Sequence, residues 1–154
     1  MAVRFERGAV DAEPGEGLIR SMAAELHDLY DGLDLDAPDM PKAGPAEMGP
    51  PGGAFLVGYE DGEAVCCGGL KKLPDGACEI KRMYVAPGAR GRGVARELLA
   101  ALEETARSLG YTVARLDTGP RQENAQIMYE SAGYRAIGNF NANPMASFWG
   151  EKLL

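Results

Sequence analysis

The stretch Met83–Ala95, MYVAPGARGRGVA, places a glycine-rich turn between a strand pattern and a helix pattern. The helix pattern runs from Val94 to about Leu109, with apolar residues three and four apart. Gly91 and Gly93 allow the backbone to approach a bound phosphate closely. Free amides and the dipole at the start of a helix attract negative charge. The stretch therefore predicts a strand–loop–helix unit that binds an anion.

Three phosphate-binding patterns compete for this loop. A Walker A loop requires a lysine followed by serine or threonine after its glycines, and none follows here. A dinucleotide fingerprint requires a small residue where Arg96 stands, because the helix must pack closely on the strand. The segment Arg90–Ala95, RGRGVA, fits the third pattern, Q/R-x-x-G-x-G/A. A plain glycine-rich connector with solvated arginines is the structural alternative.

The third pattern is the pyrophosphate signature of acyl-CoA N-acyltransferases, and the chain resembles the GNAT superfamily of N-acetyltransferases. The resemblance runs from about Ala54 to Leu153. It includes a second signature, because Gln122–Tyr134, QENAQIMYESAGY, is similar to N-x-x-A-x-x-x-Y-E-x-x-G-F/Y. Gln122 stands where the family usually has asparagine, and Asn124 follows two residues later. The resemblance implies a mixed α/β fold, in which a mostly antiparallel sheet is splayed between its fourth and fifth strands and flanked by helices.

The resemblance also implies acetyl-CoA as the co-substrate, without a metal. The pyrophosphate of acetyl-CoA would lie on the glycine-rich loop. The pantetheine arm would pair with main chain at the end of the preceding strand and with side chains at the start of a later helix. The binding residues implied in this way are Met83, Val85, Arg90, Gly91, Arg92, Gly93, Val94, Ala95, Gln122 and Asn124.

Two side chains take the family's acid–base positions. A primary amine with a pKa of about 10 is almost wholly protonated at pH 7 and must lose a proton before it attacks a thioester. By resemblance Glu79 is the general base, acting through water, and Tyr129 is the acid that protonates the departing thiolate. Strand alternation places Glu79 on the same face as Met83 and Val85. The structural alternatives are a charge pair of Glu79 with neighbouring lysine and arginine, and a tyrosine that only packs.

Composition narrows the class of protein. The 154 residues make one domain, and a net charge of −7 disfavours nucleic acid, whose binding needs basic surfaces. Three cysteines, an odd number with two adjacent, suggest reduced thiols, and a single histidine without a C-x-x-C motif disfavours zinc. No apolar run approaches the 18 or so residues that span a bilayer, and no signal peptide is recognisable. We expect a cytoplasmic protein without membrane contact.

Periodicity and turn residues predict the remaining elements. An amphipathic helix begins near Pro14 and continues to Leu33, and a Pro/Gly-rich loop at 34–53 is either a connector or a lid. A further helix, after the one that begins at Val94, is expected at Glu123–Ala132. Strands are expected at Val3–Phe5, Ala54–Tyr59, Ala64–Lys71, Ala77–Val85, Thr112–Leu116, Tyr134–Phe140 and Ala146–Leu153.

The sequence thus predicts a single N-acetyltransferase domain over residues 1–154. It would transfer an acetyl group from acetyl-CoA to a primary amine by direct attack. A non-catalytic acyl-CoA-binding or regulatory module is the alternative, and homodimer formation is left open. The acidic balance favours a cationic acceptor such as a polyamine, an aminoglycoside or a peptide amine.

Overall fold

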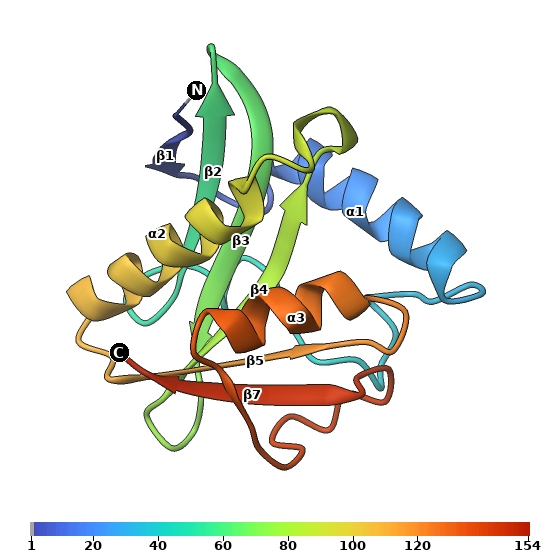
Figure 1. Cartoon of the computed structure of the whole chain (residues 1–154), viewed down its shortest axis with the longest axis vertical. Coiled ribbons are helices and arrows are strands. Elements are labelled where there is room, and N and C mark those ends of the chain that lie inside the picture. Colours follow the sequence, from blue (N-terminus) through green and yellow to red (C-terminus); the bar gives the residue numbers. More distant parts are fainter. Residues whose placement is uncertain (1) are drawn as a thin grey trace.

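A seven-stranded sheet with the order β1-β2-β3-β4-β5-β7-β6 organises the computed structural model, which describes residues 2–154 (Figure 1). The strands are β1 (Arg4–Arg7), β2 (Ala54–Glu60), β3 (Glu63–Lys72), β4 (Cys78–Val85), β5 (Val113–Thr118), β6 (Arg135–Ala136) and β7 (Phe148–Leu153). The helices are α1 (Gly15–Leu29), η1 (Pro87–Ala89), α2 (Val94–Ser108) and α3 (Glu123–Ser131). Strands β4 and β5 are parallel and the other neighbours antiparallel, so the predicted mixed α/β fold is confirmed.

The predicted splay between the fourth and fifth strands is present. Strands β4 and β5 are in register only at Cys78 with Ala114 and at Glu79 with Arg115. Beyond this point β4 continues to Val85 without a ladder partner on that side, so its backbone amides and carbonyls there are left for other partners. The sheet therefore opens a gap where β4 approaches the loop before α2.

Helices cover both faces of the sheet. The apolar side of α2, with Leu98, Leu99 and Leu102 fully buried, packs on one face together with α3. Helix α1 packs through Met22 on the opposite face, in a separate cluster that contains Phe55. Figure 1 shows α2 and α3 crossing the strands, while α1 lies apart from these two helices. In the described residues no helix is long and apolar enough to cross a membrane.

A bulge in β4 reverses the side-chain alternation at Arg82. Cys67 faces Tyr84 and Gly69 faces Lys81, so one residue of β3 is opposite two of β4. Arg82 has a positive φ of 60°, the left-handed conformation that such an extra residue can adopt.

The prediction of one continuous face from Glu79 to Val85 is therefore wrong. Met83 and Val85 pack on the cluster beneath α2 and α3, together with Ile80. Glu79, one residue before Ile80, lies on the opposite face.

Two other predicted elements are shorter than expected. Helix α1 ends at Leu29 rather than Leu33, because Asp31 and Gly32 both have positive φ. The strand predicted at Tyr134–Phe140 is reduced to β6. Beyond it, the side-chain oxygen of Asn139 accepts hydrogen bonds from two backbone amides and turns the chain out of the ladder. Residues 33–53 contain turns without a helix, as predicted for the Pro/Gly-rich loop.

Candidate active site

A cleft of about 420 Å³ lies where the end of β4, the start of α2 and helix α3 meet. Its wall includes Met83 and Val85 from β4, the loop residues Arg90, Gly91 and Gly93, and Val94, Ala95 and Arg96 of α2. The wall from α3 includes Asn124, Met128 and Tyr129, with Gln122 just before that helix. The structure thus gathers all the residues that the sequence assigned to acetyl-CoA, except Arg92, around one cleft.

The backbone of the loop is shaped for close approach of a ligand. Gly91 and Gly93 have φ of +80° and +82°, which side-chain-bearing residues rarely adopt. A Cβ atom built on either glycine would meet no protein atom within 4 Å, so the space beside the backbone is open. Gly93 is the N-cap of α2, and no side chain caps the helix. The unpaired amides of the first turn are therefore available to an anion.

The three arginines of this region have different positions. Arg90 donates to the Val85 carbonyl at 2.8 Å and to both oxygens of Glu25 at 2.8 and 3.0 Å. Arg92 forms a two-pronged pair with Glu60 at 2.8 and 2.9 Å and anchors the loop to β2, away from the cleft. Arg90 and Arg96 both line the cleft, but within the described residues only Arg90 is paired with a carboxylate, so Arg96 is the unpaired positive charge there.

A second cavity lies on the side of α1. Its wall combines apolar residues of α1 and the Pro/Gly-rich loop, such as Met22 and Met40, with polar groups of β4 and β5. Met83, Gln122 and Tyr129 line both this cavity and the cleft. The two spaces are therefore adjacent and share these three residues in their walls. We call the second space the acceptor cavity, after the role proposed for it below.

Tyr129 is 8% exposed and lies at this junction. Its hydroxyl is 3.7 Å from the sulfur of Met83, and its ring packs edge-on against Tyr134. Burial raises the pKa of the phenol, and the negative charge of Asp117 raises it further. The hydroxyl therefore keeps its proton at neutral pH and can donate it or share it in a hydrogen bond.

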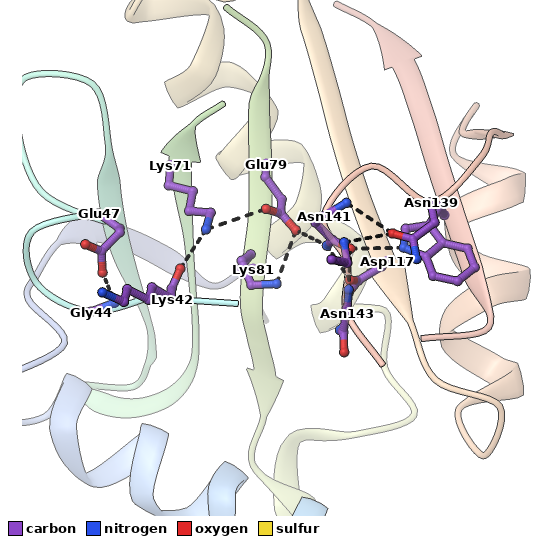
Figure 2. Close-up of polar contacts among 12 residues, drawn as sticks. Lys42, Gly44, Glu47, Lys71, Glu79, Lys81, Asp117, Asn139, Asn141 and Asn143 are labelled. Atoms are coloured by element: carbon purple, nitrogen blue, oxygen red, sulfur yellow. Dashed lines mark hydrogen bonds and ion pairs between the residues drawn. The ribbon is translucent and has the colours of Figure 1, made fainter. Parts of the chain in front are cut away.

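Glu79 is fully buried and lines neither the cleft nor the acceptor cavity. Its Oε2 accepts from Lys81 at 3.2 Å and from Asn141 at 2.7 Å (Figure 2). Its Oε1 lies 3.9 Å from Lys71 and accepts no hydrogen bond. The charge pair named as the structural alternative is thus present with Lys81, whereas in the part of the chain that the structure describes Arg82 does not take part in it. Action as a base requires a water molecule that connects Glu79 with the acceptor cavity.

A carboxylate that no sequence motif indicated does line the acceptor cavity: Asp117, near the end of β5. Its Oδ2 accepts from Asn141 at 2.6 Å and from Asn143 at 3.0 Å. Asn141 also donates to Glu79 and accepts from Trp149, so one amide links the two carboxylates, as Figure 2 shows. The signal in the sequence was the alternation of asparagines at 139, 141 and 143, of which the first lies at the end of a predicted strand and the other two in the segment that follows it.

Gln122 is held by its side-chain oxygen. This oxygen accepts from the Tyr30 hydroxyl at 3.1 Å and from the Gly119 amide at 3.3 Å. The residue is the N-cap of α3 and stands at the junction of the two spaces, while Asn124 lines the cleft alone. Gln122 therefore joins the start of α3 to Tyr30 at the end of α1.

The three cysteines are buried and free. Burial raises the pKa of Cys66 and Cys78 to about 11 and that of Cys67 to about 12. These thiols are therefore poor nucleophiles at neutral pH. In residues 2–154, no three His, Cys, Asp or Glu side chains gather in a way that could hold a metal ion.

The family model of the Acetyltransferase (GNAT) family matches residues 20–134. An IAA acetyltransferase of Azospirillum brasilense is 30% identical over 140 residues, covering 88% of each chain. The chain therefore belongs to the GNAT acetyltransferase family.

Solved structures agree at the level of the fold. A GNAT acetyltransferase from Staphylococcus aureus superposes with a TM-score of 0.79 at 17% identity, over 99% of both chains. A GNAT acetyltransferase from Elizabethkingia anophelis, solved with acetyl-CoA bound, gives 0.68 at 15% identity, over 99% of this chain and 98% of that one.

Proposed function

We propose that the protein is an N-acetyltransferase that moves an acetyl group from acetyl-CoA to a primary amine by direct attack. The observation that carries this proposal is the meeting of the cleft and the acceptor cavity at Met83, Gln122 and Tyr129. Two substrates bound from the two sides would bring their reacting groups together there, without a covalent enzyme intermediate. The raised pKa values of the buried cysteines argue against an acyl-cysteine route.

The cleft fits the donor in three respects. The open space beside Gly91 and Gly93 admits a pyrophosphate against the amides that begin α2. Arg96, which has no carboxylate partner in the described chain, adds positive charge at the same place, beside Arg90, which is held by Glu25. The unpaired edge of β4 near Met83 and Val85 offers main-chain partners to the amides of pantetheine. That a relative by fold was solved with acetyl-CoA, and another with coenzyme A, supports this assignment.

The reaction needs a proton acceptor for the amine and a donor beside the sulfur. Asp117 is the carboxylate on the wall of the acceptor cavity, and Glu79 lies behind it across Asn141. We assign the direct proton transfer to Asp117 or, through water, to Glu79. Tyr129 places its hydroxyl at the junction, where it stabilises negative charge developing on sulfur. The C–N bond forms as the C–S bond breaks, and the released thiolate takes up one proton.

Thiol release from acetyl-CoA in the presence of an amine panel tests this function. We expect acceptor-dependent release, with an acetylated amine as product by mass spectrometry. Calorimetric titration with coenzyme A is the matched binding measurement. Tight binding of coenzyme A with no release from any amine would replace the enzyme by the alternative, an acyl-CoA-binding module.

A further inference from the structure

Arg82 stands out among the cationic residues around the acceptor cavity. Its side chain lines this cavity and the neighbouring hollow under the Pro/Gly-rich loop. Within residues 2–154, its guanidinium makes no hydrogen bond and no ion pair with the protein, whereas Arg90, Arg92 and Arg121 are all paired with carboxylates. An arginine cannot lose its charge by deprotonation in the ordinary pH range, so this half-buried side chain stays charged and without an anion from the described chain. Such a group is available to an anionic ligand from outside the chain.

The backbone places this side chain in the cavity at a conformational cost. Arg82 is the bulged residue of β4, with a φ of 60°. Without the bulge, strict alternation would put residue 82 on the same face as Ile80, beneath α2 and α3. The bulge instead turns it toward α1 and the acceptor cavity. Sparsely populated backbone conformations of this kind are concentrated at functional sites.

The other charged groups of the cavity leave Arg82 free. Lys81 is next along β4 but is already paired with Glu79 at 3.2 Å. The charges of Asp36, Asp117 and Glu79 act on Arg82, and within residues 2–154 none of the three forms an ion pair with it. Asp117 is instead occupied by two asparagine amides on one oxygen. The cavity therefore presents a free guanidinium and, separately, a carboxylate.

The remaining wall of the cavity is mixed: Lys81, Thr118, Gln122 and Asn143 line part of it, and apolar side chains form most of the rest. The apolar part matters for the ligand's side chain. It is formed by Met22, Leu26, Leu33, Leu35, Met40 and Met145. A ligand that matches all three features has a carboxylate for Arg82, an amino group for Asp117 and an apolar side chain. A polyamine or an aminoglycoside would bring only positive charge to the arginine, although the net charge of −7 favours such acceptors at long range.

We propose that the acceptor is a free apolar α-amino acid, whose carboxylate Arg82 binds in the acceptor cavity. This inference rests on the proposed function and names its substrate class. The planar guanidinium can hold both carboxylate oxygens at once, and this orients the amino group toward the junction with the cleft. An amide or a decarboxylated amine lacks that anchor.

The test compares three acceptors of equal apolar size: leucine, leucinamide and isopentylamine. Rates are divided by the fraction of neutral amine at the assay pH, because the three amino groups have different pKa values. We expect kcat/KM for leucine to exceed that for either analogue by about thirtyfold or more, of the order that one desolvated charge pair supplies. Equal values for the three acceptors, or a preference for O-phosphoethanolamine over leucine, would overturn the proposal.

Variants of Arg82 assign the preference to this residue. In Arg82→Gln we expect the KM for leucine to rise, the preference over isopentylamine to vanish and the KM for acetyl-CoA to stay unchanged. Arg82→Lys should restore part of the preference, since it keeps the charge without the planar fork. Arg107→Gln, which removes an exposed arginine of α2 paired with Glu104, is the matched control and should behave as wild type. A preference that survives in Arg82→Gln would contradict the assignment.

Direct binding measurements distinguish failure of the proposed function from failure of the carboxylate site. Leucine and isopentylamine are titrated into the protein saturated with coenzyme A, with thermal stabilisation as the readout. If no amine causes thiol release from acetyl-CoA, the proposed function is refuted. Stabilisation of the wild type but not of Arg82→Gln by leucine would still support the carboxylate site. If leucine stabilises neither or both proteins, the carboxylate site is refuted. Should the variant fail to fold, the comparison of leucine with isopentylamine on the wild-type protein decides.

Discussion

Replacement of Gly93 by alanine separates the backbone strain of the glycine-rich loop from its role in binding. The residue has a φ of +82° and a Cβ would meet no protein atom within 4 Å, so the variant incurs strain without a clash. A side-chain-bearing residue in the left-handed region costs about 1–2 kcal/mol. For a chain of this size, about 1 kcal/mol corresponds to a shift of roughly 2–4 °C, so Tm should fall by about 2–8 °C.

The effect on binding should be larger than strain explains. The added methyl group would stand in the open space beside the backbone amides, where the pyrophosphate is proposed to lie. Hydrogen bonds to a charged group contribute about 1.5–3 kcal/mol each, so displacement from one amide should weaken binding of coenzyme A about ten- to hundredfold. Isothermal titration measures this affinity, and thermal unfolding of the free protein measures the strain.

Two other glycines provide matched controls. Gly110 has a φ of +93° with open space around it and lies just beyond the far end of α2, so Gly110→Ala should lose stability and keep its affinity. Gly88 is in the same loop region with open space and an ordinary φ, so Gly88→Ala should keep both. Wild-type affinity for coenzyme A in a folded Gly93→Ala protein would refute the phosphate-loop assignment.

Three further outcomes are expected. Tyr129→Phe should lower kcat by up to about 10²-fold with little change in coenzyme A affinity, because the hydroxyl acts when charge develops on sulfur. If the variant keeps the wild-type kcat while the chemical step is rate-limiting, Tyr129 is only a packing residue. The rates of Asp117→Asn and Glu79→Gln should each be measured across pH. The variant that lacks the proton acceptor should lose most of its rate at low pH and regain it as the pH approaches the pKa of the amine, whereas a pH-independent loss indicates a structural role. The free energy of unfolding should fall above about pH 9, because burial raises the pKa of the three thiols to about 11 or 12 and the unfolded chain releases these protons first. Urea midpoints measured from pH 8 to 10 test this. An equal fall in a variant with all three cysteines replaced by alanine would contradict it.

Much of the donor side could be predicted from local sequence. The sequence RGRGVA between a strand and a helix implied a glycine-dependent turn, and the structure has positive φ at both Gly91 and Gly93. The second signature placed Tyr129 on a helix, and its hydroxyl does reach β4. These predictions succeeded because each depends on residues close together in the chain, where turn chemistry and helical period decide the geometry.

The acceptor side could not be predicted in this way. Asp117 and Glu79 are linked by Asn141, which is 24 and 62 residues away from them in sequence. The Asn-containing loop itself was divided between a predicted strand and an unassigned segment. No local pattern states which asparagine will reach which carboxylate, since that depends on how β5 and β7 pair across the sheet.

The sequence by itself determined the strand–loop–helix unit, the order of most elements and the family resemblance, because these depend on short-range backbone preferences and apolar periodicity. Only the tertiary structure decided which face of β4 each residue occupies. The bulge at Arg82 results from the register of β4 against β3, and it places Glu79 and Val85 on opposite faces of the sheet. A one-residue shift in register inverts every later side chain, and such a shift is set by pairing between strands, which the alternation within one strand does not record.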